Sequence, residues 1–217
     1  MKTKFFIAFA SLAFLFTACQ KDNDDTTTDP DPNNTEDYQP VSAGSTWQYA
    51  STTTGNYSET ALGGDTTIGG EKYFILDNSE NGRRYINKNN GVYKSSGYIQ
   101  AIQQSVNMTY LKDAPAGTTW EDNLVYSKGL ITVPVAVKYT IASRDGDKVV
   151  NNKTYNNVIA VDLALTANSV LIGGLKTIAT GRQFYAKGVG NIGGSLHVDV
   201  LDIQIDDSTY LVSHDIK

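Results

Sequence analysis

Cysteine and histidine, the side chains that most often act as nucleophiles, bases and zinc ligands, are rare in this 217-residue sequence. It contains one cysteine, Cys19, and two histidines, His197 and His214. A single cysteine excludes an internal disulfide, and the sequence has neither the His-x-x-x-His nor the Cys-x-x-Cys spacing that predicts a zinc site. The residues around Cys19 therefore decide which chemistry its thiol undergoes.

The residues before Cys19 have the layout of a secretory signal peptide, with a basic start, an apolar run from Phe5 to Phe16, and two small residues. The run is about a dozen residues long, shorter than the roughly 20 that span a bilayer as a helix. The segment Phe16-Thr17-Ala18-Cys19 resembles a bacterial lipobox, with Phe16 where the pattern prefers leucine. This resemblance implies that residues 1–18 are removed and that Cys19 is acylated on its sulfur and on its new N-terminus.

The residues after Cys19 are polar and acidic. They are similar to the export signal of Bacteroidetes-type surface lipoproteins, in the residues Gln20, Lys21, Asp22, Asp24 and Asp25. The resemblance implies an outer-membrane anchor that faces the cell exterior, with a periplasm-facing anchor as the alternative. Asp25-Thr26-Thr27 resembles the short O-glycosylation signal of the same bacterial group, which implies Thr26 as a candidate glycosylation site.

The segment from Gln20 to Asp37 contains no aliphatic or aromatic residue, so it cannot bury enough surface to become ordered. Residues 19–37 are therefore predicted to form the lipidated cysteine and a disordered tether, and residues 38–217 a single domain. Seven of the 23 acidic residues lie in this tether against one lysine, which leaves the rest of the chain close to neutral. No basic patch is interleaved with aromatic residues, which argues against a nucleic-acid partner.

Two groups of side chains are candidates for catalysis or metal binding. Ser195 and His197 lie two residues apart on one face of a predicted strand, about 7 Å along it, so we expect no direct hydrogen bond between them. A second group offers carboxylates for calcium but lacks a glycine-turned loop, and we expect it to be solvated: Asp199, Asp202, Asp206 and Asp207. Neither group predicts an enzyme, a metal or a cofactor. A hydrolase with a pair of carboxylates is the least favoured alternative.

Short runs rich in Val, Ile, Thr and Tyr, broken by Gly, Asn and Asp, predict an all-β protein of antiparallel strands. Turn dipeptides predict hairpins at Gly69-Gly70, Asn90-Gly91 and Asp145-Gly146. The run from Ser195 to Ile205 changes its apolar face after Val200, which predicts one strand with a bulge or a kink. The other expected strands are Thr46 to Thr53, Tyr57 to Leu62, Glu71 to Asp77, Arg84 to Lys88, Val92 to Lys94, Tyr98 to Val106, Leu130 to Ala142, Val158 to Ala167, Gln183 to Ala186 and Thr209 to Ser213.

A short motif occurs twice, as Ala43-Gly44-Ser45-Thr46-Trp47 and as Ala116-Gly117-Thr118-Thr119-Trp120. Each copy precedes an Asp-led hairpin, an apolar strand and an aromatic strand ending in a glycine turn, which predicts pseudo-repeats over about residues 43–93 and 116–192. We expect the two similar halves to pack as a curved antiparallel sheet, a partly open barrel or a sandwich. The matching positions of Trp47 and Trp120 favour core anchors over sugar-stacking platforms.

The Gly-x-x-Trp starts, together with the closing segment Tyr185-Ala186-Lys187-Gly188-Val189-Gly190-Asn191-Ile192, resemble a group of uncharacterised Bacteroidetes-type lipoproteins. The resemblance covers residues 43–192 and implies an all-β fold without implying an activity. Parts of the sequence are also similar, at the level of fold alone, to the curved sheets of lipoprotein-carrier and lipocalin-like proteins.

Tyrosine is abundant, with 13 residues, and its apolar ring with a polar end suits binding faces as well as sheet edges. Tyr93, Tyr98, Tyr110 and Tyr126 are the candidate ligand contacts, with half-buried strand packing as the alternative. The sequence thus predicts a membrane-anchored, non-enzymatic binding or accessory module whose partners are the membrane, through the lipid, and a glycan or protein. The alternative is a carrier or sensor of an apolar ligand in a lipocalin-like cavity.

Overall fold

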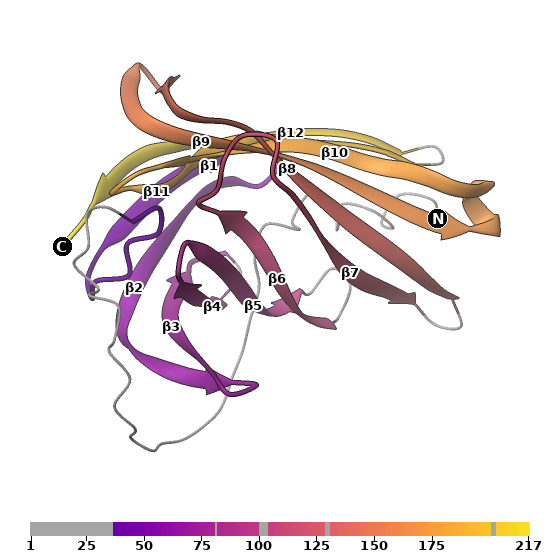
Figure 1. Cartoon of the computed structure of the whole chain (residues 1–217), viewed down its shortest axis with the longest axis horizontal. Helices are drawn as coiled ribbons and strands as arrows, with labels where there is room; N and C mark the ends of the chain where they lie inside the picture. The colour runs from indigo at the N-terminus through magenta and orange to yellow at the C-terminus, as the bar shows by residue number, and fades with distance from the viewer. Residues whose placement is uncertain (1–36, 81, 100–103, 129–130, 201–202) are drawn as a thin grey trace.

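The computed structural model describes residues 37–80, 82–99, 104–128, 131–200 and 203–217. Its 12 antiparallel strands form one sheet, which curls until it is nearly closed into a barrel (Figure 1). In chain order the strands are β1 (Thr46–Ser51), β2 (Gly55–Ile68), β3 (Glu71–Asn78), β4 (Gly82–Asn89), β5 (Val92–Ile99), β6 (Gln104–Lys112), β7 (Thr119–Lys128), β8 (Ile131–Val150), β9 (Lys153–Ser169), β10 (Gly174–Ala186), β11 (Gly190–Val200) and β12 (Ile203–Asp215). A 3-10 turn, η1 (Val170–Ile172), connects β9 to β10. Within the described ranges, no helix is both long and apolar enough to cross a bilayer.

Consecutive strands pair with one another everywhere except between β6 and β7, which are the two ends of the sheet order. The first and last strands, β1 and β12, pair instead and hold the two halves of the sheet together. The gap between β6 and β7 is the one unsealed seam of the barrel, and it is called the seam below. The all-β prediction is confirmed, and the partly open barrel is the form that the sheet takes.

The tight turns follow local backbone chemistry. Gly69-Gly70 joins β2 to β3 with φ angles of 59° and 84°, and Asn90-Gly91 joins β4 to β5 with 48° and 74°. Both hairpin predictions are confirmed, because two successive positive φ angles match the twist of the flanking strands. The Asp145-Gly146 prediction is wrong: Asp145 has a φ of 57° but lies inside β8, where the register to β9 shifts. The positive φ angle serves a bulge there.

Two predicted strands are each two strands in the structure. The run from Ser195 to Ile205 crosses from β11 to β12, and Val200 is paired with Ile203. The change of apolar face therefore marks a hairpin, and the prediction of a bulge or kink within one strand is wrong. The run from Tyr98 to Val106 likewise crosses from β5 to β6, with Tyr98 paired to Ser105.

Both tryptophans are core anchors, as predicted, with 1% of Trp47 and 8% of Trp120 exposed. The strands β1 and β7 that carry them begin after turns with the same hydrogen bonds: Gly44 N–H donates to Ala61 O, and Gly117 N–H to Ile141 O, each at 2.8 Å. Trp47 Nε1 donates to the Val189 carbonyl at 2.7 Å. Whether the two halves are true sequence repeats stays a prediction.

The segment from Asp37 to Ser42 lies across one end of the barrel, with Tyr38 buried. Lys88 Nζ is 2.5 Å from Asp37 Oδ2, and the Gly188 N–H donates to the Asp37 carbonyl at 2.7 Å. Asp37, one residue before the predicted domain, is thus held by the barrel. Because turns alternate between the two ends of an up-and-down sheet, this end also carries the β2–β3, β4–β5, β8–β9 and β10–β11 turns.

Candidate functional site

A cavity of about 130 Å³ lies inside the barrel. Alternate residues of a strand face the same side, so each strand contributes side chains two residues apart. The apolar wall comes from β6, β8 and β9: Val106, Met108, Val137, Tyr139, Val161, Leu163 and Leu165. The polar wall comes from β4, β5, β10, β11 and β12: Arg84, Ser95, Gln183, Tyr185, Asn191, Asp207 and Thr209. The cavity is thus two-sided, with one apolar and one hydrogen-bonding wall.

Arg84, on the polar wall, forms a buried ion pair with Glu59. Arg84 Nη1 lies 3.1 Å from Glu59 Oε1 and 3.2 Å from Oε2, and the two side chains are 4% and 3% exposed. Asn78 donates to Glu59 Oε1 at 3.3 Å, and Arg84 Nε donates to Ser95 Oγ at 3.2 Å. Burial acts to lower the pKa of Arg84, but the Glu59 carboxylate, with nearby tyrosines, raises it overall. The guanidinium faces the carboxylate, so as an ion pair they add no net charge to the interior.

Tyrosines surround this ion pair. The Tyr110 ring lies 5.4 Å from the Arg84 guanidinium carbon, and the Tyr49 and Tyr57 rings are stacked with centroids 5.1 Å apart. Burial raises the pKa of Tyr110 well above its ordinary value and that of Tyr185 to about 12. These hydroxyls therefore stay protonated at neutral pH and act as donors, as when Tyr110 donates to Gln39 Oε1 at 3.1 Å.

Two donors of the cavity have weak partners or none. Asn191 Nδ2 donates to Gln183 Oε1 at 3.1 Å, while Asn191 Oδ1 accepts from the Gly193 N–H at 2.9 Å. Among the described residues, nothing accepts a hydrogen bond from Gln183 Nε2. Within the same described part of the chain, the hydrogen-bond partner of the Tyr139 hydroxyl is the Met108 sulfur, at 3.9 Å.

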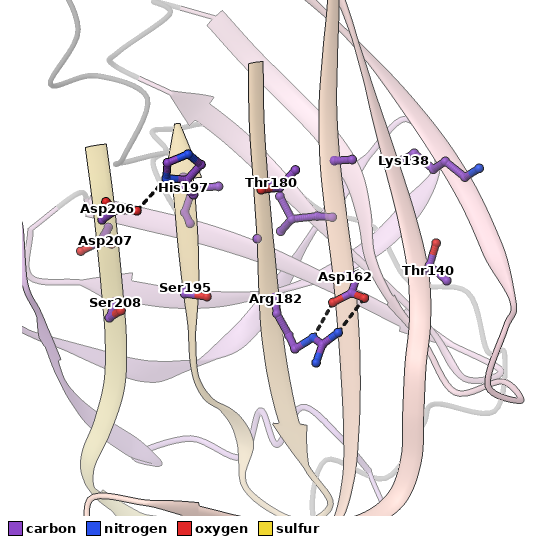
Figure 2. Close-up of a pocket in the computed structure, with 14 residues that line it drawn as sticks. Lys138, Thr140, Asp162, Thr180, Arg182, Ser195, His197, Asp206, Asp207 and Ser208 are labelled. Atoms are coloured by element: carbon purple, nitrogen blue, oxygen red, sulfur yellow. Dashed lines mark hydrogen bonds and ion pairs between the residues drawn. The ribbon is translucent and has the colours of Figure 1, made fainter. Parts of the chain in front are cut away.

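A second hollow, the outer groove, covers about 520 Å³ on the outer face of β8–β12 (Figure 2). Arg182 binds Asp162 through two contacts, Nε to Oδ1 at 2.5 Å and Nη2 to Oδ2 at 2.8 Å. His197 Nδ1 lies 2.7 Å from Asp206 Oδ1. In Figure 2 Ser195 lies on the same strand as His197 but away from its ring, and the histidine points to Asp206. The groove is a charged, hydrogen-bonding surface on which the acids and bases pair with each other.

The aspartates considered for calcium do not converge. Asp206 faces the outer groove, whereas Asp207 is buried and accepts from Ser51 Oγ at 2.8 Å and Thr53 Oγ1 at 2.9 Å. Asp202 lies outside the described residues. Among those described, no three His, Cys, Asp or Glu side chains are grouped to hold a metal ion.

The predicted ligand-contact tyrosines are scattered. Tyr110 lines the cavity, while Tyr93 is buried and its hydroxyl accepts from the Tyr38 N–H at 3.3 Å. Tyr126 packs half-buried against the core, and the side chain of Tyr98 is not among those described. The predicted sites at Cys19, the export segment Gln20 to Asp25, and Thr26 also lie outside the described residues.

Sequence reasoning missed the polar wall of the cavity. Glu59 lies between the buried Tyr57 and Ala61 at a spacing of two, and Arg84 lies two residues before the buried Ile86. Charged residues in phase with the apolar face of a strand are the signal that would have indicated an interior pair.

Comparisons with known proteins show the fold and little else. No protein-family model matches the chain, and no curated protein matches it. A crystal structure of a candidate lipoprotein from Parabacteroides distasonis matches with a TM-score of 0.52 and 12% identity. The match covers 82% of this chain and 98% of that protein. At this identity the likeness shows a shared architecture.

Proposed function

We propose that this protein is a lipid-anchored lipoprotein whose β-barrel is a non-enzymatic binding module held in the water beyond the membrane. The lipobox-like segment ending at Cys19 supports the anchor. The likeness in fold to a candidate lipoprotein is consistent with it. The acidic segment after Cys19 favours an anchor in the outer membrane with the barrel facing the cell exterior. A periplasm-facing anchor is the alternative.

The observation that carries the proposal is the attachment of Asp37 to one end of the barrel. Lys88 and the Gly188 N–H hold Asp37, so the chain leaves the folded domain at that end. The residues between Cys19 and Asp37 reach roughly 60 Å when fully extended. As a coil they average about 20–25 Å. A tether of this length would let the barrel stand off the membrane and rotate, joined to the anchor through its Asp37 end.

The interior cavity supports a role as a carrier or sensor of a small ligand. Its volume of about 130 Å³ is below the roughly 300–1,000 Å³ of pockets for drug-sized ligands, so the ligand must be small. The two-sided lining provides both apolar contact and hydrogen bonds. Gln183 is half-buried, and its Nε2 has no acceptor among the described residues, so this amide is open to a ligand or to water.

The outer groove supports a second candidate, binding of a glycan or protein. Its paired charges, Asp162 with Arg182 and His197 with Asp206, present both acceptors and donors to an extended polar ligand. Glycan-array screening of the wild-type protein and of an Asp162→Asn variant tests this candidate. A specific signal that the variant loses supports it, whereas an equal signal from both proteins opposes it.

The anchor is tested by feeding an alkyne fatty acid to a Gram-negative host that produces the full chain. We expect the label on the wild-type protein and none on a Cys19→Ala variant. We also expect the labelled protein to remain in the membrane fraction after a high-salt wash. A protease added to intact cells will digest the barrel if it faces outward. Unlabelled wild-type protein that washes off membranes would contradict the anchor.

A further inference from the structure

We propose that the barrel interior binds a small uncharged molecule with an apolar body and a carbonyl or ether oxygen, and that Gln183 Nε2 donates to that oxygen. The inference rests on the proposed binding role of the barrel and not on the lipid anchor.

The orientation of the Gln183 amide follows from a main-chain group. The Gly193 N–H can only donate, so the Asn191 atom that it contacts at 2.9 Å is the acceptor oxygen Oδ1. Asn191 Nδ2 is then the donor toward Gln183, and the Gln183 atom at 3.1 Å must be Oε1. This leaves Gln183 Nε2 directed elsewhere, and Gln183 lines the cavity.

The backbone beneath Gln183 is shaped to seat this side chain. A Cβ atom at Gly194 would lie 2.3 Å from the Arg182 carbonyl oxygen of β10, and 2.6 Å from both Gln183 Cδ and Oε1. Any larger residue would therefore displace the backbone of β10 as well as the Gln183 amide. The glycine on β11 and the Asn191 amide together fix the free donor in one position.

The apolar wall lies beside this donor. Gln183 of β10 is paired with Val161 of β9, and Leu163 of β9 is paired with Tyr139 of β8. The Tyr139 ring is stacked on Trp120, with centroids 5.2 Å apart and planes at 9°, so its position is fixed. Its hydroxyl contacts a thioether sulfur, which is a weak acceptor. The cavity thus has hydrogen-bonding capacity that the described protein groups do not use.

The charges of the interior disfavour an anionic ligand. Glu59 neutralises Arg84, and Asp207 already accepts from Ser51, Thr52 and Thr53. A ligand carboxylate would have no free cation to meet and would pay its desolvation without compensation. The volume is close to that of an apolar protein cavity of about 150 Å³ that holds benzene. The ligand is therefore about one ring in size.

Cyclohexanone and methylenecyclohexane are suitable probes, because they differ in shape by little more than a carbonyl oxygen against a methylene group. Their binding to the full chain in lipid nanodiscs can be measured by ligand-observed NMR, with empty nanodiscs as the blank. In Gln183→Leu we expect the affinity for cyclohexanone to fall about three- to tenfold, as for the loss of one hydrogen bond. The affinity for methylenecyclohexane is expected to hold or rise, which also reports that the variant is folded.

Two further variants complete the test. Gln48→Leu, on the exposed face of β1, is the matched control and is expected to leave both affinities unchanged. Val161→Phe fills the cavity and is expected to abolish binding of both probes. Unchanged cyclohexanone binding in Gln183→Leu, or an equal loss of both probes, would overturn the proposal, as would normal binding to Val161→Phe. The outcome is separable from that of the anchor, because Cys19→Ala changes membrane retention and leaves the affinities as they are.

Discussion

The Trp120 indole N–H donates to the main-chain oxygen of Thr109 at 2.6 Å, across the seam. The Thr109 N–H in turn donates to Asp122 Oδ2 at 2.8 Å. Side chains of β7 thus satisfy both main-chain groups of one β6 residue, in place of a strand ladder. The seam is held by a few specific contacts, whereas every other junction of the barrel is held by paired strands.

Replacing Trp120 is expected to loosen the seam. Trp120→Phe keeps a ring to stack on Tyr139 but removes the donor to the Thr109 carbonyl. We expect the free energy of unfolding, measured by urea titration, to fall by about 1–3 kcal/mol. Trp47→Phe is the comparison, because it loses an equivalent bond to Val189 in the closed part of the barrel. Hydrogen exchange in β6 and β7 is expected to rise in Trp120→Phe alone, and equal exchange in both variants would contradict the role of the seam.

Removing one partner of the interior ion pair is expected to destabilise the fold strongly. Arg84→Met leaves the Glu59 carboxylate buried without a cation, and we expect a loss of about 3–5 kcal/mol in the free energy of unfolding. The double variant Glu59→Leu with Arg84→Met removes both charges and is expected to recover most of that loss. Chemical denaturation of the single and the double variant measures the two free energies of unfolding. A cost below about 1 kcal/mol for Arg84→Met alone would mean that water reaches the pair.

His214 is expected to make stability depend on pH. Burial and the nearby Lys153 lower its pKa from the ordinary value of 6.5, and Lys153 Nζ lies 2.8 Å from its Nε2. The unfolded chain therefore binds more protons than the folded one below about pH 6.5, so the free energy of unfolding falls as the pH decreases through this window. His214→Gln is expected to flatten that slope, and Lys153→Met to reduce it. A slope that is the same in all three proteins would assign the pH dependence to other groups.

Features set by neighbouring residues could be predicted from the sequence, and features set by strand register could not. The Gly69-Gly70 and Asn90-Gly91 turns need only two residues with positive φ angles. The Asp145-Gly146 pair has the same local chemistry, but pairing with β9 makes it a bulge. The strand β7 was not predicted, because Glu121, Asp122 and Asn123 have low strand propensity. In the structure, the packing of its inward-facing residues outweighs this low propensity.

The candidate site was also beyond prediction, because its parts come from distant strands. Glu59 and Arg84 are 25 residues apart and meet only when β2, β3 and β4 are aligned. Gln183 and Tyr139 become neighbours of one cavity only through β9. Of the four tyrosines predicted as ligand contacts, Tyr110 lines that cavity, and its sequence neighbours gave no reason to separate it from the others.

Two tyrosine hydroxyls of the cavity wall are expected to contribute unequally to stability. The Tyr110 hydroxyl donates to Gln39 Oε1 at 3.1 Å, whereas the Tyr139 hydroxyl contacts the Met108 sulfur at 3.9 Å. Tyr110→Phe is expected to lower the free energy of unfolding by about 0.5–1.5 kcal/mol, because it leaves a buried acceptor unpaired. Tyr139→Phe removes a hydroxyl with a poor acceptor and is expected to cost less than about 0.5 kcal/mol. Urea titration of the two variants measures the difference, and each variant keeps its ring and so its packing. An equal cost at the two positions would mean that Tyr139 has a stronger partner than the thioether, and would contradict the unused hydrogen-bonding capacity that we assign to the cavity.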